Sequence, residues 1–217
     1  MIFSQDLQFA FEHKHVFNGI SISSGKEITN AGIIALLGPS GSGKTTLLRL
    51  FAGLLEPGSG EIKKIGTKGA GISWAFQEPR LVPWLSVRKN CLVQSYGKKK
   101  PSVSLLEQCA KDLEIYDALD LFPKDLSGGM KSRASLLRSI LHQEPWFFWD
   151  EPFSALDRPL RNRLLPLLRN KILSMGSSCM VVLHDAEDAR IFADYSLLLP
   201  SSGHGVVTLS KVLRTPS

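Results

Sequence analysis

The sequence predicts an α/β protein with a mostly parallel central sheet covered by helices. Short apolar runs alternate along the chain with stretches of helical periodicity, which is the pattern of strands linked by crossover helices. The 217 residues, 43% of them hydrophobic and 21% charged, are enough for one globular domain with a substantial core. We therefore expect a single domain over 1–217, with a sheet core at about 1–78 and 127–217 and an inserted helical lobe at about 79–126.

Composition and cysteine content favour a cytoplasmic protein. The chain has no run of eighteen apolar residues, and its first residues lack the basic start and apolar core of a secretion signal. Cys91, Cys109 and Cys179 are odd in number and widely separated, which suits free thiols in a reducing compartment. The net charge of +6 and the run GKKKP (Gly97–Pro101) are compatible with binding to nucleic acid or an anionic membrane, but we favour a solvated loop.

The apolar run Ile33–Leu37 predicts a strand, and a phosphate-binding loop follows it. The segment GPSGSGKTT fits the pattern G-x-x-x-x-G-K-[ST], and the helical stretch TTLLRLFAGL supplies the context that this motif requires. Glycines let consecutive N–H groups surround a phosphate, while Lys44 neutralises the β- and γ-phosphates and the Thr45 hydroxyl is a Mg²⁺ ligand. A chance glycine-rich turn is the alternative. The expected nucleotide-binding residues are Gly38, Pro39, Ser40, Gly41, Ser42, Gly43, Lys44, Thr45 and Thr46.

A second apolar run, Ile72–Phe76, ends at Gln77. Ligands of parallel sheets bind beyond the carboxyl ends of the strands, so this side chain is placed to ligate Mg²⁺ or to orient water. A glutamine alone signals almost nothing, and its position at a strand end is the whole argument.

The stretch from about Pro79 to Leu126 predicts a mainly helical lobe. Ser104 and Glu107 form a capping-box pattern at a helix start, and Pro101 and Pro123 bracket the helical segments. We expect the lobe and the sheet core to be distinct packing units.

The segment LSGGMKSRASLLRSI (Leu126–Ile140) predicts an amphipathic helix that opens with a serine and two glycines. The free N–H groups and the dipole at such a helix start favour an anion. The expected apolar face comprises Met130, Ala134, Leu137 and Leu141, and the side chains expected largely off it are Lys131, Ser132, Arg133 and Arg138. Since this segment belongs to the lobe and the P-loop to the core, we expect the second site to take the phosphate of a partner molecule.

The apolar run Trp146–Trp149 predicts a buried strand that ends at Asp150 and Glu151. Asp150 is placed to hold Mg²⁺ through water, and Glu151 to polarise the attacking water. Two acids at an ordinary helix N-terminus are the alternative. A further run, Cys179–Leu183, ends at His184, which is placed to contact a γ-phosphate unless it is a satisfied core or surface histidine.

Taken in order, GPSGSGKTT, FQEPRLVPW, LSGGM, FFWDEPFSALD and VVLHDAEDA resemble the motifs of the nucleotide-binding subunit of an ABC transporter, from about Phe11 to Asp194. The resemblance implies a P-loop NTPase fold with a RecA-like core, an antiparallel edge subdomain and a helical lobe that carries the LSGG signature. It also implies that two subunits pair head to tail around two ATP molecules. Ser127, Gly128 and Gly129 would then hold the γ-phosphate of the ATP bound to the other subunit.

The same resemblance assigns roles to single residues. Asp150 and Glu151 match the Walker B acids, and His184 matches the switch histidine. The segment Ser154–Asp157 matches the loop that crosses the dimer seam, and Gln77 matches the residue that links the nucleotide to the groove for the membrane subunit. The adenine is expected to stack on an aromatic residue near the N-terminus, for which the choice is Phe11, with Phe9 and Phe17 as competitors.

The segment FQEPRLVPWLSV, which includes Gln77, is similar to the corresponding segment of bacterial uptake ATPases for nitrate, sulfonates, taurine and pyrimidine precursors. That branch of the family also tends to carry methionine at the position of Met130. This implies a homodimer of ATPase subunits on the cytoplasmic face of the cell membrane, with permease subunits, an external binding protein, ATP and Mg²⁺, and without nucleic acid. The segment 25–32, which leads into the P-loop strand, is longer than is usual in this family, and the segment 60–77 is shorter. Leu183 stands where threonine is common in the family. No catalytic group is missing, so we expect an active enzyme.

Other classes stay open at this point. A soluble ABC-type ATPase that acts on DNA or ribosomes usually carries long insertions, for which 217 residues leave no room. A P-loop kinase or GTPase would not need LSGGM. A subunit that binds ATP without hydrolysing it is distinguished by a phosphate-release assay.

Overall fold

Two β-sheets of different kinds frame the chain. The computed structural model describes residues 3–12, 14–23, 31–63, 71–93 and 101–213. The six-stranded sheet has the order β10-β8-β3-β7-β6-β5 and is parallel except for β10. The mostly parallel sheet predicted from the sequence is thereby confirmed. Its strands are β3 (Ile33–Leu37), β5 (Ile72–Ala75), β6 (Trp146–Asp150), β7 (Ser178–Val182), β8 (Tyr195–Leu198) and β10 (Ser210–Lys211).

The second sheet is the antiparallel edge subdomain implied by the resemblance. Its order is β4-β1-β2-β9, in which β1 (Phe3–Phe11) runs antiparallel to both β2 (Lys14–Ser23) and β4 (Ser59–Lys63). The strand β9 (Gly205–Thr208) adds parallel to β2 and so returns the C-terminal part of the chain to the N-terminal sheet.

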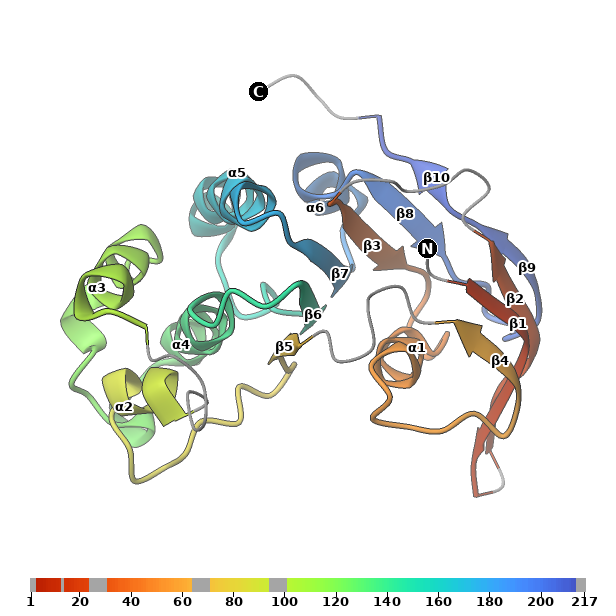
Figure 1. The fold of residues 1–217 in the computed structure, drawn as a ribbon, viewed down its shortest axis with the longest axis horizontal. Helices are drawn as coiled ribbons and strands as arrows, with labels where there is room; N and C mark the ends of the chain where they lie inside the picture. The colour runs from red at the N-terminus through yellow and green to blue at the C-terminus, as the bar shows by residue number, and fades with distance from the viewer. Residues whose placement is uncertain (1–2, 13, 24–30, 64–70, 94–100, 214–217) are drawn as a thin grey trace.

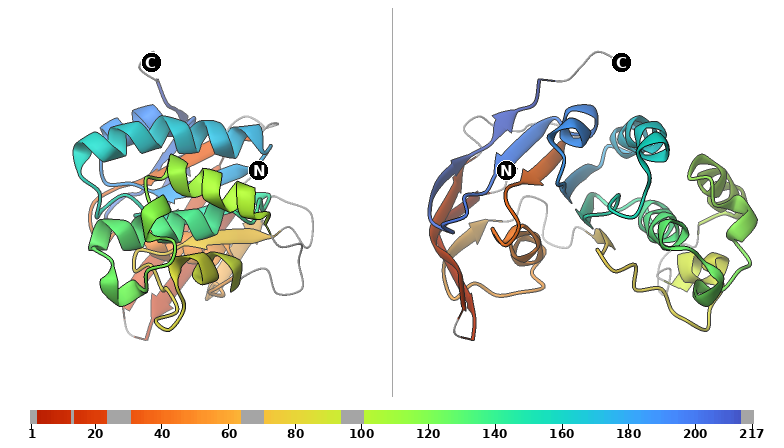
Figure 2. Two further views of the ribbon diagram at one scale, coloured as in Figure 1. Left: turned by 90° about the vertical axis from the view of Figure 1, so that its left-hand side faces the viewer. Right: turned by 180° about the vertical axis from the view of Figure 1, so that it is seen from behind.

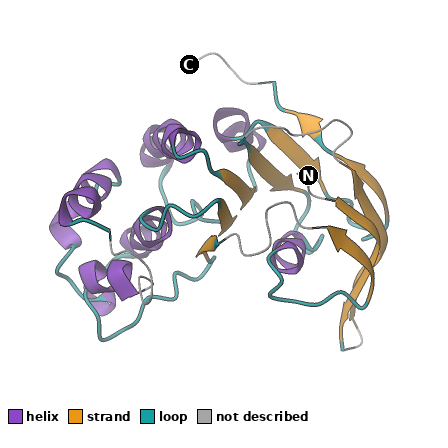
Figure 3. Ribbon diagram, viewed as in Figure 1, coloured by secondary structure: helices purple, strands orange, loops and turns teal. Residues whose placement is uncertain are grey.

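Most of the helices lie on one side of the six-stranded sheet, whereas α1 (Lys44–Phe51) lies between the two sheets (Figures 1 and 3). Figure 2 shows the same arrangement from behind. The other helices are α2 (Val87–Leu92), α3 (Val103–Asp112), α4 (Gly128–Ile140), α5 (Arg158–Ser174) and α6 (Ala186–Phe192), with the 3₁₀ turns η2 (Tyr116–Ala118) and η3 (Pro123–Asp125).

The central strands bury both faces, so the apolar residues divide between two cores. In β3, Ile33 and Ala35 belong to the core on the helical side, while Ile34 and Leu36 belong to the core between the sheets. The alternation follows from the two-residue period of a strand. A strand that is apolar at every position is therefore stable only in the middle of such a sandwich, which is why the continuous runs predicted buried strands.

The expectation that the lobe and the sheet core are distinct packing units is wrong. Leu106 and Cys109 of α3 belong to the same apolar cluster as Phe147 and Trp149 of β6. The connecting element is α4, which lies between the sheet and the helices α2 and α3 (Figure 1). Because α4 contributes Leu136 and neighbouring side chains to that cluster, one core extends from the sheet into the lobe.

Two local expectations also need correction. The N-cap of α3 is Ser102, whose side chain accepts a hydrogen bond from the N–H of Leu105 (3.2 Å), so the helix has already begun at Ser104. Arg138 was expected off the apolar face of α4, yet it is 4% exposed. Its guanidinium donates to the carbonyl oxygens of Pro79 (2.8 Å) and Arg80 (2.9 Å), which supply the polar contacts that burial of a charge requires.

The three cysteines are free thiols, and all are buried. Burial raises the pKa of Cys91 to about 12 and also raises that of Cys179. Within the described residues, no helix combines the length and apolarity needed to cross a bilayer. The lysines of the basic run, residues 25–30 of the long segment at 25–32 and residues 64–70 of the short segment at 60–77 lie outside the described residues.

Candidate functional site

The phosphate-binding loop joins β3 to α1, and its glycines have the backbone geometry that the motif predicts. Gly43 is the N-cap of α1 with a φ of 88°, and Gly41 has a φ of 80°. At Gly41 a methyl group would meet nothing within 4 Å, so this side of the loop is open. At Gly43 the same methyl group would lie 2.6 Å from Cζ of Phe17, so the loop rests directly on a core ring of the antiparallel sheet.

Lys44 is 6% exposed and bends back over the loop, where its Nζ donates to the carbonyl oxygens of Gly38 and Pro39 at 2.9 Å each. These contacts fix the ammonium group next to the loop interior. Ser42 is buried and does not line the loop cavity. The cavity in front of the loop is therefore not lined by Gly38, Pro39 or Ser42, whereas the other predicted loop residues line it.

A cavity of about 310 Å³ lies in front of the loop. It unites residues from four segments of the chain, of which the P-loop, Glu151 and His184 follow strands of the parallel sheet as the carboxyl-end argument predicts, and the β1–β2 hairpin is the fourth. The lining residues are Phe11, Lys14, Val16, Ser40, Gly41, Gly43, Lys44, Thr45, Thr46, Glu151 and His184.

Thr45, which lines this cavity, contacts Asp150 at the end of β6. The hydroxyl of Thr45 donates to Oδ1 of Asp150 at 2.8 Å. The carboxyl group of Asp150 is 1% exposed, and its Oδ2 has no hydrogen-bond partner among the described residues. Burial raises the pKa of this carboxyl group, an effect that the hydrogen bond from Thr45 opposes. An acidic oxygen without a partner beside a hydroxyl is a donor set that fits Mg²⁺, since this ion prefers oxygen ligands.

Glu151 lies between Gln77 and His184. Its Oε2 accepts a hydrogen bond from Nε2 of Gln77 (3.1 Å), and its Oε1 lies 2.7 Å from Nε2 of His184. Glu151 itself has a φ of 50°, a left-handed conformation that is uncommon for a residue with a side chain. Such a conformation persists where the surroundings determine it. Three side chains predicted from three different strand ends are thus brought into one cluster.

Of the three aromatic candidates for the adenine, Phe11 alone lines the cavity. Its ring is 44% exposed and packs edge-on against Phe9, with ring centroids 4.8 Å apart. Phe9 is 9% exposed and Phe17 is fully buried under Gly43, so both are core residues. The geometry therefore favours Phe11 over its two competitors.

The second predicted anion site does not contribute to this cavity. Ser127 is the N-cap of α4, and its Oγ accepts a hydrogen bond from the N–H of Met130 at 3.3 Å. Ser127 and Gly128 are exposed, and a methyl group on Gly128 would meet nothing within 4 Å. Among the lining residues of the P-loop cavity there is none from this helix start. Its N–H groups are accessible to a ligand from outside the chain.

The sequence reasoning missed several residues around the site. Lys14 and Val16 line the cavity because the β1–β2 pairing places Lys14 opposite Phe11. Arg161 binds the loop that follows Glu151 through the carbonyl oxygen of Leu156 (2.9 Å). A hairpin around Phe11 was the available signal for Lys14, whereas nothing in the local pattern distinguishes Arg161 from the other arginines of α5.

Comparison with known proteins shows which family has this sequence pattern. The profile of the family described as ABC transporter matches residues 23–154. An aliphatic sulfonates import ATP-binding protein of Rhodococcus jostii is 36% identical over 185 residues, which are 84% of this chain and 72% of that protein. A thiamine import ATP-binding protein of Vibrio parahaemolyticus is 33% identical over 205 residues, which are 90% of this chain and 85% of that protein.

The fold has equally extensive counterparts among solved structures. The dimeric structure of a bacterial ABC transporter cassette superposes with a TM-score of 0.81 at 23% identity, over 99% of this chain and 100% of that one. The same cassette in a post-hydrolysis state with ADP and Pi gives a TM-score of 0.80 at 22% identity, with the same coverage. The family profile, the relatives and the fold agree with the motif order, and the chain belongs to the ABC transporter family as one of its ATPase cassettes.

Proposed function

We propose that this chain is the ATP-hydrolysing subunit of an importer, in which two copies close over two ATP molecules and drive uptake of a small solute through a separate permease. The observation that carries the proposal is the position of Glu151, between Gln77 and His184 at the edge of the P-loop cavity. The chain is similar to ATP-binding proteins of importers, which supports the direction of transport.

The cavity is suited to a nucleoside triphosphate with its metal. Lys44 and the N–H groups from Gly41 to Thr46 surround the phosphates, and Phe11 stacks on the base. Thr45 and Asp150, together with Gln77, would hold Mg²⁺. When bound, Mg²⁺ neutralises the oxygens of the β- and γ-phosphates.

Glu151 is the residue assigned to the water. Its carboxylate accepts a hydrogen bond from the attacking water and takes up its proton as the bond from the water oxygen to the γ-phosphorus forms, while the bond from the γ-phosphorus to the β–γ bridging oxygen breaks and ADP leaves. Gln77 and His184 hold the carboxylate from two sides, so its orientation is set before the water binds. Phosphoryl transfer requires mainly this kind of positioning, together with the positive charge of Lys44.

The exposed helix start at Ser127–Gly129 supplies the second half of each site. Its N–H groups and dipole favour an anion, and in a head-to-tail dimer they contact the γ-phosphate bound to the other subunit. We therefore propose that the homodimer contains two active sites, each complete only across the subunit seam.

The membrane partner and the solute follow from the relatives by analogy. The chain would lie on the cytoplasmic face of the cell membrane, bound to permease subunits that receive solute from an external binding protein. The relatives described above are named for the import of aliphatic sulfonates and of thiamine, so the proposed solute of this chain is a small molecule of either kind, or nitrate, taurine or a pyrimidine precursor.

The test of hydrolysis is Glu151→Gln. The amide keeps the shape of the carboxylate but cannot accept the proton, so phosphate release should stop while ATP binding persists. Wild-type turnover in this variant would remove Glu151 from its assigned role. A wild-type protein that binds ATP without releasing phosphate would identify the non-hydrolysing class instead.

The test of the shared site is Ser127→Arg, with Lys44→Ala as its matched comparison. Ser127→Arg should leave ATP binding to the monomer nearly intact but block nucleotide-driven dimerisation and hydrolysis, because the long side chain obstructs the helix start. Lys44→Ala should weaken binding itself. If both variants weaken monomer binding equally, the assignment of Ser127 to the other subunit's nucleotide is wrong.

A further inference from the structure

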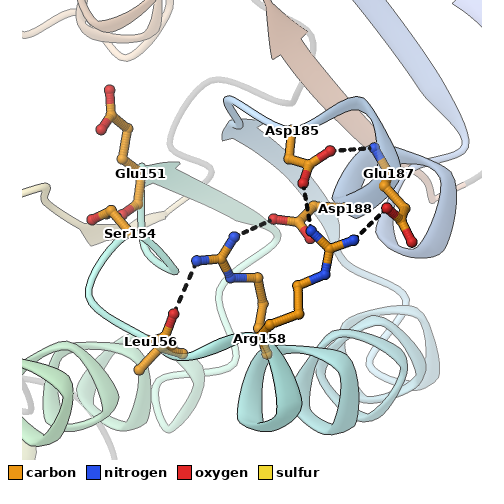
Figure 4. A network of polar contacts seen from close by, with 8 residues as sticks. Glu151, Ser154, Leu156, Arg158, Asp185, Glu187 and Asp188 are labelled. Carbon is orange, nitrogen blue, oxygen red and sulfur yellow. Dashed lines mark hydrogen bonds and ion pairs between the residues drawn. The ribbon is translucent and has the colours of Figure 1, made fainter.

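The loop after β6 and the start of α6 are joined by arginines that the proposed chemistry does not use. Arg161 donates from Nη2 to the carbonyl oxygen of Leu156 (2.9 Å) and from Nη1 to Oδ2 of Asp188 (3.0 Å). One turn earlier on α5, Arg158 donates to Oδ2 of Asp185 at 3.0 Å and also pairs with Glu187. Figure 4 shows these contacts, with Leu156 and Arg158 below Glu151 and Ser154, and with Asp185, Glu187 and Asp188 to their right.

Burial distinguishes the two arginines. The side chain of Arg158 is 47% exposed, and those of its partners are 35% and 60% exposed, so its ion pairs are surface pairs of small effect. The side chain of Arg161 is 19% exposed and that of Asp188 is 4% exposed. Loss of one partner of such a buried pair leaves the other charge uncompensated.

Arg161 opposes the effect of burial on the pKa of Asp188. Burial raises the pKa of the Asp188 carboxyl group, and the charge and hydrogen bond of Arg161 act in the opposite direction. The other oxygen of the carboxyl group, Oδ1, has no hydrogen-bond partner within the described part of the chain.

A cavity of about 220 Å³ separates the two segments that Arg161 joins. Its lining includes Glu151 and Ser154 from the first segment, His184 and Asp188 from the second, and Arg161. The segments leave adjacent strands of the sheet, where Asp150 pairs with Val182. Beyond the sheet the two segments contact each other again through Glu151 and His184. Arg161 connects them a second time, through its hydrogen bonds to Leu156 and Asp188. Because the space between them is not filled by side chains, these bridges set their spacing.

We infer that Arg161 is a positioning residue for the contact between Glu151 and His184: it holds the loop at Leu156 and the first turn of α6 at the spacing that brings the imidazole to the carboxylate. The inference rests on the proposed function, because it gives the Glu151–His184 contact its catalytic meaning. Arg161 itself is not among the lining residues of the P-loop cavity.

The test compares Arg161→Met with Arg158→Met, since both arginines lie on α5 and bind the same helix. The first measurement is the ¹⁵N spectrum of the imidazole ring in the nucleotide-free protein, with the His184 signal assigned by its loss in His184→Gln. We expect Arg161→Met to move this signal toward its position in Glu151→Gln, and Arg158→Met to leave it at the wild-type position. This readout does not require turnover, so it tests the inference even if the wild-type protein fails to hydrolyse ATP.

The second measurement separates positioning from general destabilisation. In Arg161→Met, kcat for ATP hydrolysis should fall roughly 10- to 100-fold, since misplacement of a reacting group by about 1 Å costs this much, with KM for ATP changed less than about twofold. Asp188→Asn removes the charge but keeps the shape of the side chain, and it should lower kcat with the same small change in KM. It takes the place of Arg161→Met as the test if that variant folds poorly. An unchanged His184 signal in both Arg161→Met and Asp188→Asn, or an equal shift in Arg158→Met, would overturn the inference.

Discussion

The contact between the phosphate-binding loop and Phe17 predicts a large effect of Gly43→Ala. Gly43 has a φ of 88°, and the added methyl group would lie 2.6 Å from Cζ of Phe17 and 2.8 Å from Cγ1 of Val16. Phe17 is fully buried, so its ring has no free space to move into. Gly41→Ala is the matched control, because Gly41 has a φ of 80° but open space around the methyl position.

The magnitudes follow from these two differences. A left-handed conformation costs an alanine about 1–2 kcal/mol, and this term is shared by both variants. Overpacking against Phe17 adds about 1–3 kcal/mol in Gly43→Ala alone. For a chain of 217 residues, 1 kcal/mol lowers Tm by roughly 2–4 °C, so Gly43→Ala should melt roughly 2–12 °C below Gly41→Ala.

The assay is thermal unfolding of the nucleotide-free protein, followed by circular dichroism. Below both melting temperatures, Gly43→Ala should also bind a fluorescent ATP analogue more weakly, because lifting the loop from Phe17 displaces Lys44. Equal melting temperatures for the two variants would refute the reasoning, since they would show that the loop does not rest on the ring.

Three further outcomes follow from single contacts. Arg169→Ala should lower the free energy of unfolding in urea by about 3–5 kcal/mol, because its buried guanidinium pairs with Asp194 at 2.6 Å. Cys91 has a pKa of about 12, and a raised thiol pKa means fewer thiolates at a given pH. At pH 8 only ~10⁻⁴ of this thiol is ionised, so thiol reagents should label it slowly in the folded protein and rapidly in urea. Phe11→Ala should weaken ATP binding by about 1–3 kcal/mol in calorimetry while Phe11→Trp retains it, and Phe9→Ala should mainly lower Tm.

The strand ends were predictable because their chemistry is local. An apolar run followed by a polar residue or a glycine-rich loop marks both the strand and the edge of the sheet at which it ends: β5, β6 and β7 lead to a polar residue, and β3 leads to the phosphate-binding loop. The contact of Thr45 with Asp150, 105 residues later, then follows from the parallel topology. The sequence does not reveal which end groups touch, since this depends on the strand order β3-β7-β6-β5. The clamp of Glu151 between Gln77 and His184 is a consequence of that order.

Arg138 and Ser102 show where local reasoning fails. Periodicity compares a side chain only with others on the same helix, and on that basis Arg138 belongs to the solvent side of α4. The structure buries it because the chain after Gln77 returns across α4 and offers the carbonyl oxygens of Pro79 and Arg80. For α3, Ser102 and Ser104 both precede suitable residues, and the choice between them is decided by the hydrogen bond from Leu105. Long-range backbone contacts of this kind leave no pattern in a single sequence.

The loop that follows Glu151 connects the two halves of the proposed active site within one chain. On one side a methyl group on Gly129, in the first turn of α4, would lie 3.1 Å from the carbonyl oxygen of Ala155, so the exposed helix start packs closely on this loop. On the other side the next residue, Leu156, accepts the hydrogen bond from Arg161, which also holds α6 near His184. We therefore expect a ligand that displaces the first turn of α4 to displace the loop as well, and the ion pair of Arg161 with Asp188 to pass that displacement toward the imidazole beside Glu151. In the proposed head-to-tail dimer, the phosphate at the helix start would belong to the partner's nucleotide, so we expect occupation of one site to bear on the geometry of the other through these contacts.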